Sequence, residues 1–240
     1  MCTGALEDGT HRIVRIHPVP ARYLDPGQRF AKFQWIRARV RNHENDPRPD
    51  SLRIDASSIE LGEEIPAERA EERIRLLEAS PQYMRSVEEL QRRQKTDKTS
   101  LAVIRPKEIT GISLGRRSDA ERKEWVEKER ELLSQTTLEF MRPPKPIDFP
   151  EVRFQVEWVC DDQTCSGHKM GLEQWGLHEL SRRLRDDADH DRKIIDLMTR
   201  ELDLVTRDVF MFLGSFRTIM WNFGLMDVYS PKRKRQMTLF

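Results

Sequence analysis

The sequence lacks the features that would place it in a membrane or an export pathway. No apolar run approaches the roughly 18 residues that a membrane-spanning helix needs. The opening residues, MCTGALEDGTHR, contain no basic segment followed by an apolar one, so no signal peptide is expected. We therefore expect a cytoplasmic protein with no membrane partner.

Cysteine is scarce, and neither sign of charge is in excess. Three cysteines in 240 residues are too few for a disulfide framework. In a reducing cytosol they would be thiols or metal ligands. Lysine and arginine number 42 against 41 acidic residues, which leaves a net charge of +1. Because no overall field attracts nucleic acid, a nucleic-acid interface would have to be a local patch.

Two common enzyme signatures are also missing. There is no glycine-rich phosphate loop, which argues against an ATP-driven motor. There is no G-x-S-x-G nucleophile elbow, which argues against an α/β-hydrolase.

What is present is a mixture of strand and helix patterns. Alternation of apolar and polar residues predicts strands, and apolar residues at helical spacing predict helices. The expected strands are 13–19, 33–40, 51–61, 99–106, 108–114, 152–160, 208–215 and 218–228. The expected helices are 66–80, 87–94, 118–133, 171–186 and 189–204, the third opening on a Ser118–Glu121 capping box. This mixture predicts an α+β fold.

A proline-rich segment suggests a domain boundary. RPPKPIDFP, Arg142–Pro150, holds four prolines in nine residues and cannot continue a helix or a sheet interior. We expect a strand-rich region with helices over 1–145, an α+β region over 146–229, and a basic tail over 230–240.

A short loop carries three candidate metal ligands. Cys160, Cys165 and His168 lie within nine residues, directly after an expected strand. Thiolate and imidazole are the ligands that structural zinc prefers. Cys2, the remaining cysteine, is the expected fourth ligand, with His17 and His178 as alternatives. The alternative without a metal is a buried strand cysteine and a surface histidine.

A basic stripe is expected in the N-terminal region. Arg37, Arg39 and Arg41 alternate along one expected strand, Lys32 is close by, and Phe33 and Trp35 are interleaved. Basic residues with aromatics suit phosphate contacts and base stacking. The alternative is an ordinary solvated sheet face.

Acidic residues offer a competing hypothesis. Asp50, Asp55 and Glu60, or the pair Asp161–Asp162, would hold Mg²⁺ in a metal-dependent nuclease if they met in space. The usual strand pattern of two acidic residues followed by a lysine is absent.

The last residues contain the most specific motif. Four basic residues, Lys232, Arg233, Lys234 and Arg235, precede Gln236, Met237, Thr238, Leu239 and Phe240. QMTLF resembles the pentapeptide by which bacterial proteins dock on the DNA polymerase sliding clamp. Met237 and Thr238 depart mildly from the commonest residues of that motif. The resemblance implies that Gln236 lies at a groove edge and that Leu239 and Phe240 fill apolar pockets. A basic tether would help near DNA.

The body of the chain carries a second resemblance. RIHPVPARYLDPGQRFAKFQWI and FQVEWVCDDQTCSGHKM are similar to an uncharacterised bacterial family, from which no activity carries over. The N-terminal stretch resembles PUA-like small barrels that hold nucleic acid, at the level of fold only.

Together these features predict a bacterial DNA-associated protein with a structural zinc, recruited to the sliding clamp in replication, repair or defence. A metal-dependent nuclease and a protein-only adaptor are the alternatives.

Overall fold

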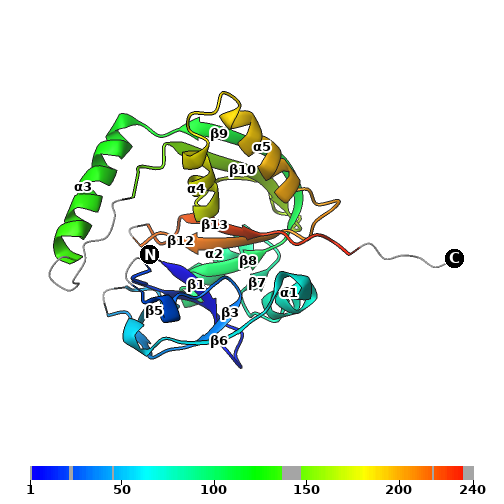
Figure 1. The fold of residues 1–240 in the computed structure, drawn as a ribbon. Coiled ribbons are helices and arrows are strands. Elements are labelled where there is room, and N and C mark those ends of the chain that lie inside the picture. Colours follow the sequence, from blue (N-terminus) through cyan, green and yellow to red (C-terminus); the bar gives the residue numbers. More distant parts are fainter. Residues whose placement is uncertain (1, 22–23, 45, 137–146, 218, 235–240) are drawn as a thin grey trace.

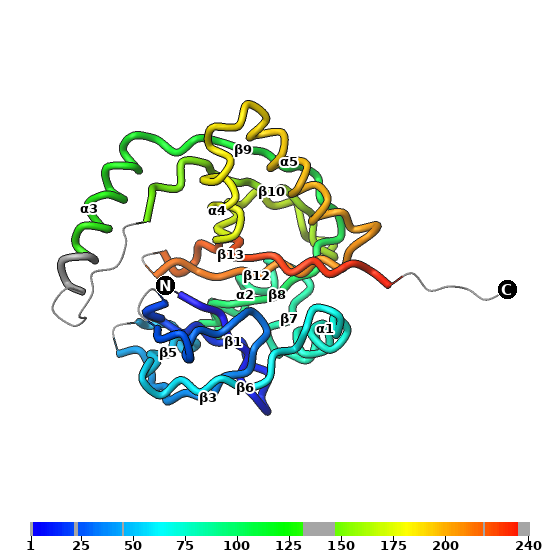
Figure 2. The backbone as a smooth tube through the Cα atoms, in the orientation of Figure 1, coloured from blue at the N-terminus to red at the C-terminus, as the bar shows by residue number. Residues whose placement is uncertain are grey.

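A computed structural model describes residues 2–21, 24–44, 46–136, 147–217 and 219–234. Within them lie five α-helices and three β-sheets, which confirms the expected α+β class. In Figures 1 and 2 the N-terminal strands form a lower layer, and α4 and α5 lie on the opposite side of the strands β12 and β13.

Two small sheets come from the N-terminal part of the chain. The larger has the order β1 (Thr3–Leu6), β2 (Ile13–Ile16), β5 (Ser51–Ile54), β4 (Val40–Asn42), and the smaller pairs β3 (Gln34–Arg37) with β6 (Glu60–Glu64). The β2–β5 pair is parallel and the others are antiparallel. Among the described strands β1 and β4 remain edges, so they do not close into a barrel.

A seven-stranded sheet forms the centre of the molecule. Its order is β7 (Tyr83–Met84), β8 (Leu101–Ile104), β12 (Phe210–Ser215), β13 (Phe223–Tyr229), β11 (His168–Leu172), β10 (Val152–Cys160), β9 (Pro106–Arg116). β9 pairs with β10 from Arg116↔Val152 to Pro106↔Cys160. The boundary expected between 145 and 146 therefore falls inside one continuous sheet.

The helices pack around this sheet. They are α1 (Ala70–Glu78), α2 (Val87–Asp97), α3 (Asp119–Thr136), α4 (Trp175–Arg183) and α5 (His190–Glu201). The predicted capping box at the start of α3 is confirmed, since Glu121 accepts from the Ser118 backbone N–H at 2.8 Å. The main core joins Phe154 and Trp158 of β10 to Ile194 and Met198 of α5.

Two predicted elements differ from the structure. The strand expected over 33–40 is broken into β3 and β4, which belong to different sheets. The helix expected over 171–186 starts later, because His168–Leu172 pairs with β10 as β11. In both places pairing with distant strands overrides the local pattern.

The two layers meet at a buried ion pair. The Arg15 guanidinium on β2 donates from Nη1 to Asp50 Oδ1 at 3.2 Å and to Ser100 Oγ at 2.9 Å. Asp50 also accepts from the Ser100 backbone N–H at 2.9 Å. The side chains of Arg15 and Asp50 are only 6% and 5% exposed. A charge removed from water in this way is tolerated only when it is paired and hydrogen-bonded.

Replacing Arg15 with methionine should therefore destabilise the fold strongly. Arg15→Met leaves the Asp50 carboxylate buried without its partner, and we expect a loss of roughly 3–5 kcal/mol in the free energy of unfolding. Arg37→Met is the control, because Arg37 is exposed, and it should change stability by at most about 0.5 kcal/mol. Urea denaturation measures both. Equal stability of the two variants would contradict this role for Arg15.

Candidate metal centre

Four potential metal ligands converge at the end of β10. They are Glu88, Cys160, Cys165 and His168, and their ligand atoms all lie within 4.8 Å of one another. It is the only such group of three or more found across the described part of the chain. The structure thus unites the three ligands expected from the loop and adds Glu88.

The β10–β11 hairpin positions three of these ligands. Cys160 ends β10, His168 begins β11 opposite Trp158, and Cys165 lies in the connecting loop. Gly167 adopts a φ of +95°, a conformation that side chains rarely tolerate, and this lets the chain turn back into β11. The backbone N–H of Cys160 donates to Cys165 Sγ at 3.2 Å, which holds the loop against the end of the strand.

The fourth ligand comes from the first turn of α2. Ser86 is the N-cap of this helix and its Oγ accepts from the Glu89 backbone N–H at 3.1 Å. The same hydroxyl donates to Asp162 Oδ2 in the loop at 2.9 Å. One serine therefore caps α2 and ties it to the hairpin loop, which places Glu88 beside the two cysteines.

Two of the distances within the cluster suit a tetrahedral ion. Cys165 Sγ and His168 Nε2 are 3.3 Å apart, and His168 Nε2 lies 3.3 Å from Glu88 Oε1. A tetrahedron with zinc bonds of about 2.0–2.3 Å has edges of about 3.3–3.8 Å. Four protein ligands of this kind leave no open coordination position, which is the arrangement of a structural site.

Burial shapes the electrostatics of the cluster. Burial is the main cause that raises the pKa of the Cys160 thiol to about 12. Hydrogen bonds from the Thr164 backbone and hydroxyl, and from Ser86, lower the pKa of Asp162 to about 2. Glu88 Oε2 is a buried oxygen with no hydrogen-bond partner. A carboxylate oxygen left in this state is costly unless a cation or another donor meets it.

Cys2 is not part of this cluster. It is exposed near the start of β1, and its electrostatic neighbours are Arg15, Arg48 and Asp46 in the N-terminal layer. The expected tie between Cys2 and the loop was therefore wrong. His17 stacks on His43 at 5.9 Å, His178 lies against Phe154 at 4.9 Å, and neither belongs to the cluster. The only hint of Glu88 in the sequence was an acidic first turn of the expected helix over 87–94.

The basic stripe expected on 32–41 is not formed as a unit. Arg37 lies opposite Glu60 in the β3–β6 pair, and Arg39 Nη2 bonds Asp55 Oδ2 at 2.8 Å. The break between β3 and β4 puts Arg41 in another sheet. Lys32 reaches across to Asp227 on β13 at 2.6 Å.

The acidic residues of the nuclease alternative do not meet. Asp50 is buried with Arg15, whereas Asp55 accepts from the Ser57 backbone N–H and pairs with Arg39. Glu60 is exposed on β6. Asp162 is bound to Ser86 and Thr164. None of these arrangements assembles the carboxylates that a Mg²⁺ ion would need.

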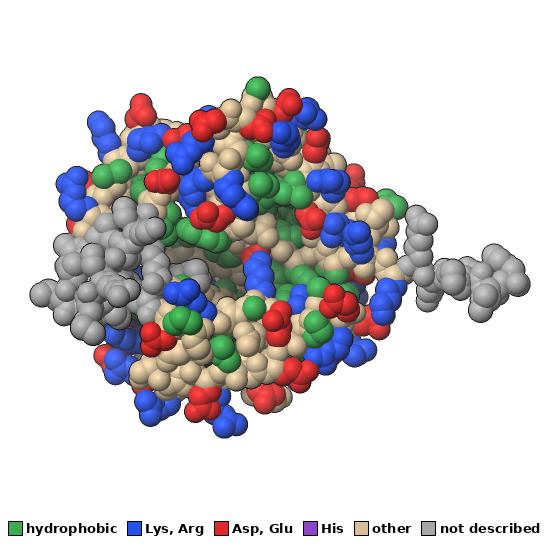
Figure 3. All heavy atoms as spheres, in the orientation of Figure 1, with side chains coloured by type: hydrophobic (Ala, Val, Ile, Leu, Met, Phe, Trp, Pro, Cys, Tyr) green, Lys and Arg blue, Asp and Glu red, His purple; other side chains and the backbone are tan. Residues whose placement is uncertain are grey.

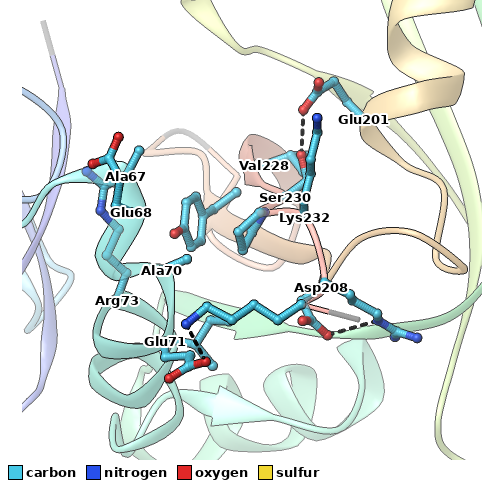
Figure 4. Close-up of a pocket in the computed structure, with 15 residues that line it drawn as sticks. Ala67, Glu68, Ala70, Glu71, Arg73, Glu201, Asp208, Val228, Ser230 and Lys232 are labelled. Carbon is cyan, nitrogen blue, oxygen red and sulfur yellow. Dashed lines mark hydrogen bonds and ion pairs between the residues drawn. The ribbon is translucent and has the colours of Figure 1, made fainter. Parts of the chain in front are cut away.

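The last described residues lie along a hollow of about 870 Å³ between α1 and the end of β13 (Figure 4). Arg233 bonds Asp208 at 3.2 Å and Lys234 bonds Glu71 at 2.8 Å. Arg235 and the QMTLF motif, Gln236–Phe240, lie outside the described residues.

A second polar cluster joins α4 to α5. His190 Nε2 lies 3.0 Å from Ser181 Oγ, and its Nδ1 lies 2.6 Å from Asp191 Oδ1. These contacts have the order of a serine–histidine–aspartate triad. Ser181 is buried, however, and Asp191 is bound by Arg116 at 2.7 and 3.0 Å. Neither described cavity is lined by Ser181 or His190. We therefore interpret the cluster as a structural contact between α4 and α5.

Comparison with known proteins places the chain in a family. A family model described as a domain of unknown function (DUF8757) matches residues 83–240, which include the whole metal cluster. The chain belongs to this family. A second model, also of a domain of unknown function (DUF8758), matches residues 1–79. No curated protein and no solved structure matches the chain.

The DUF8757 region meets the DUF8758 region at the Arg15 ion pair, since Arg15 and Asp50 belong to the second and Ser100 to the first.

Over the described residues, no helix has the length and apolar character that crossing a membrane requires.

We expect Ser86→Ala to affect both the fold and the metal cluster. Losing the cap should lower the free energy of unfolding by about 1 kcal/mol. Losing the contact with Asp162 should weaken binding of added Zn²⁺ or Co²⁺ by about tenfold, as for other residues that orient ligands. Ser118→Ala is the matched control, because Ser118 caps α3 in the same way and does not touch the cluster. Equal metal binding by both variants would argue against the role of Ser86.

Proposed function

We propose that this chain is a bacterial DNA-associated protein that holds a structural zinc ion and docks on the DNA polymerase sliding clamp through Gln236–Phe240. The convergence of Glu88, Cys160, Cys165 and His168 within 4.8 Å supports the zinc. The likeness of QMTLF to the clamp-docking pentapeptide supports the partner.

The zinc would join two elements that the sheet alone leaves weakly connected. The loop over 161–167 and the N-terminus of α2 meet through the hydrogen bond between Ser86 and Asp162 and through the four ligands. An ion bound to both would fix the loop against α2. Two thiolates and an imidazole favour zinc over Mg²⁺ or Ca²⁺, which prefer oxygen.

Purified protein should contain about one zinc per chain. Cys165→Ser and His168→Ala should each lose most of it, whereas Cys2→Ser, which alters a cysteine outside the cluster, should retain it. The affinity should also fall as the pH falls, because the Cys160 thiol, with a pKa of about 12 without metal, must release its proton to bind.

Elemental analysis and a chromogenic chelator measure the content and the release of zinc. Less than about half an equivalent in protein purified with added zinc would contradict the site. Equal loss of zinc from Cys2→Ser and His168→Ala would do the same.

The clamp contact would work from a surface segment. Lys232, Arg233 and Lys234 are exposed, and the ion pairs of Arg233 and Lys234 with Asp208 and Glu71 involve solvent-accessible groups. Such pairs contribute little, with a median of about 0–1 kcal/mol, so they would not hold the segment against the body. An extended peptide can then enter an apolar groove without unfolding a domain.

Intact protein should bind a bacterial sliding clamp with an affinity on the order of micromolar. Gln236→Ala and Phe240→Ala should each weaken binding by at least about tenfold, because each removes a contact with the groove. Thr238→Ala is the matched control, since that position of the motif accepts small residues. Biosensor binding with immobilised clamp measures all three.

Two results would contradict the docking hypothesis. One is the absence of binding by the intact protein at about 100 times the expected dissociation constant. The other is equal binding by the intact and Phe240→Ala proteins. Clamp binding without any affinity for DNA would instead favour the protein-only adaptor.

A further inference from the structure

The turn between β12 and β13 presents aromatic side chains to solvent. Among the described aromatic residues Trp221 is the most exposed, at 71%, and Phe216 is 42% exposed in the same turn. Ile219 adds an apolar side chain at 41%, and Arg217 is exposed between them. We call Phe216, Arg217 and residues 219–222 the aromatic turn. Exposed large apolar groups gathered in one short turn mark a contact surface more often than a random surface position.

The aromatic turn is held in place by its own backbone. The Phe216 N–H donates to Asn222 O at 3.3 Å, and the Asn222 N–H donates to Ile219 O at 3.0 Å. The Phe216 ring also packs closely over Gly224, where an added Cβ would lie 2.8 Å from ring atom Cζ. The backbone of the turn and the Phe216 ring are thus positioned before any partner arrives, which lowers the entropy lost on binding.

An unusual pair of arginines lies on the neighbouring sheet. Arg41 on β4 and Arg53 on β5 are directly opposite each other in an antiparallel pair, and both are exposed. Like charges at such positions are destabilising. Among the described carboxylates, the one within 4.0 Å of Arg41 is that of Glu44, at 3.6 Å. Arg53 has no carboxylate within 4.0 Å among the described residues. A bound anion would remove this repulsion.

The arginine pair lies partly on β5 and the aromatic turn follows β12, and these two strands meet near Arg15. Ser51 and Arg53 alternate on β5, and Ser51 lies opposite Arg15, so all three share one face of the sheet. That face is turned toward β12, because a Cβ on Gly214 would lie 3.6 Å from Arg15 Nη2. Arg48, from the loop after β4, donates to Ser215 O at the base of the aromatic turn.

The distribution of charge over the molecule favours binding of a polyanion at a local patch rather than attraction by the protein as a whole. Figure 3 shows basic and acidic side chains mixed over the visible face. The overall charge is +1, and Arg39 and Arg233, two other arginines that the sequence pointed to, are paired with carboxylates. A polyanion would therefore be attracted to a local cluster of exposed arginines rather than to the molecule as a whole.

We propose that the aromatic turn and the Arg41–Arg53 pair bind single-stranded DNA. Trp221 and Phe216 would stack on unpaired bases, and Arg41, Arg53 and Arg217 would contact phosphates. A duplex hides its base faces inside the stack, so exposed rings of this kind favour a single strand. This inference deepens the proposed association with DNA and rests on it.

Fluorescence anisotropy with an oligothymidine of about 20 nucleotides, longer than one stacking site, tests the proposal on the full chain. Trp221→Ala should weaken binding by at least about fivefold, since stacking contributes on the order of 1–3 kcal/mol per base. Trp175→Ala, at a half-exposed tryptophan on α4, is the control and should bind normally.

The double variant Arg41→Gln/Arg53→Gln should lower the slope of log affinity against log salt by about 1.4, for two lost phosphate contacts. Arg75→Gln/Arg92→Gln makes the same change in charge at exposed positions on α1 and α2 and should leave the slope unchanged. Tryptophan fluorescence of the intact protein should be quenched by the oligonucleotide, and this quenching should be reduced in Trp221→Ala.

The outcomes separate the two levels of the hypothesis. If the intact protein binds the single strand and the Trp221 and Arg41/Arg53 variants bind equally well, the patch is wrong and the association with DNA remains. Preference for a duplex of the same length would also overturn the patch. If the intact protein binds neither form of DNA, the proposed association itself fails.

Discussion

The buried guanidinium of Arg15 is the contact on which the arrangement of the molecule depends. Its charged partner, Asp50, lies in the same family segment, residues 1–79, and Ser100 of residues 83–240 adds hydrogen bonds to both groups. A buried ion pair needs further hydrogen bonds to offset its desolvation, and Ser100 supplies such bonds from the other segment. Hydrophobic contacts do not depend on direction, whereas the hydrogen bonds of Ser100 with Arg15 and Asp50 do, so they favour one placement of the two layers.

Other contacts also join the N-terminal layer to the rest of the molecule. The Gln82 side chain hydrogen-bonds both to the backbone N–H and to the C=O of Ile13, as a neighbouring strand would. The Arg73 guanidinium lies 4.3 Å from the centre of the Phe33 ring, which packs on Tyr229 at 4.6 Å. These contacts hold the N-terminal layer against the seven-stranded sheet.

The sequence predicted the contacts between residues that are close along the chain, and it failed where distant segments meet. Cys160, Cys165 and His168 share one hairpin, so their spacing alone predicted their proximity. Glu88 joins them through the Ser86–Asp162 bond, a tertiary contact that no spacing reveals. The three arginines of 37–41 alternate as a single strand would require, yet the chain breaks between two sheets, and the partner strands decide their charge environment. Strand β10 was predicted with its observed bounds because its alternation matches its burial along its whole length.

The proposed contacts with DNA and with the clamp are individually weak, and their combination is what would give them effect. A pentapeptide binds on the order of micromolar, and stacking of one or two bases with a few phosphate contacts is salt-sensitive. Joined in one chain, the first contact raises the effective concentration of the second, by up to the millimolar range for a short linker. Simultaneous binding then requires a single strand close to the clamp. A protein built in this way would select a site where both are present and would leave DNA or clamp alone largely unoccupied.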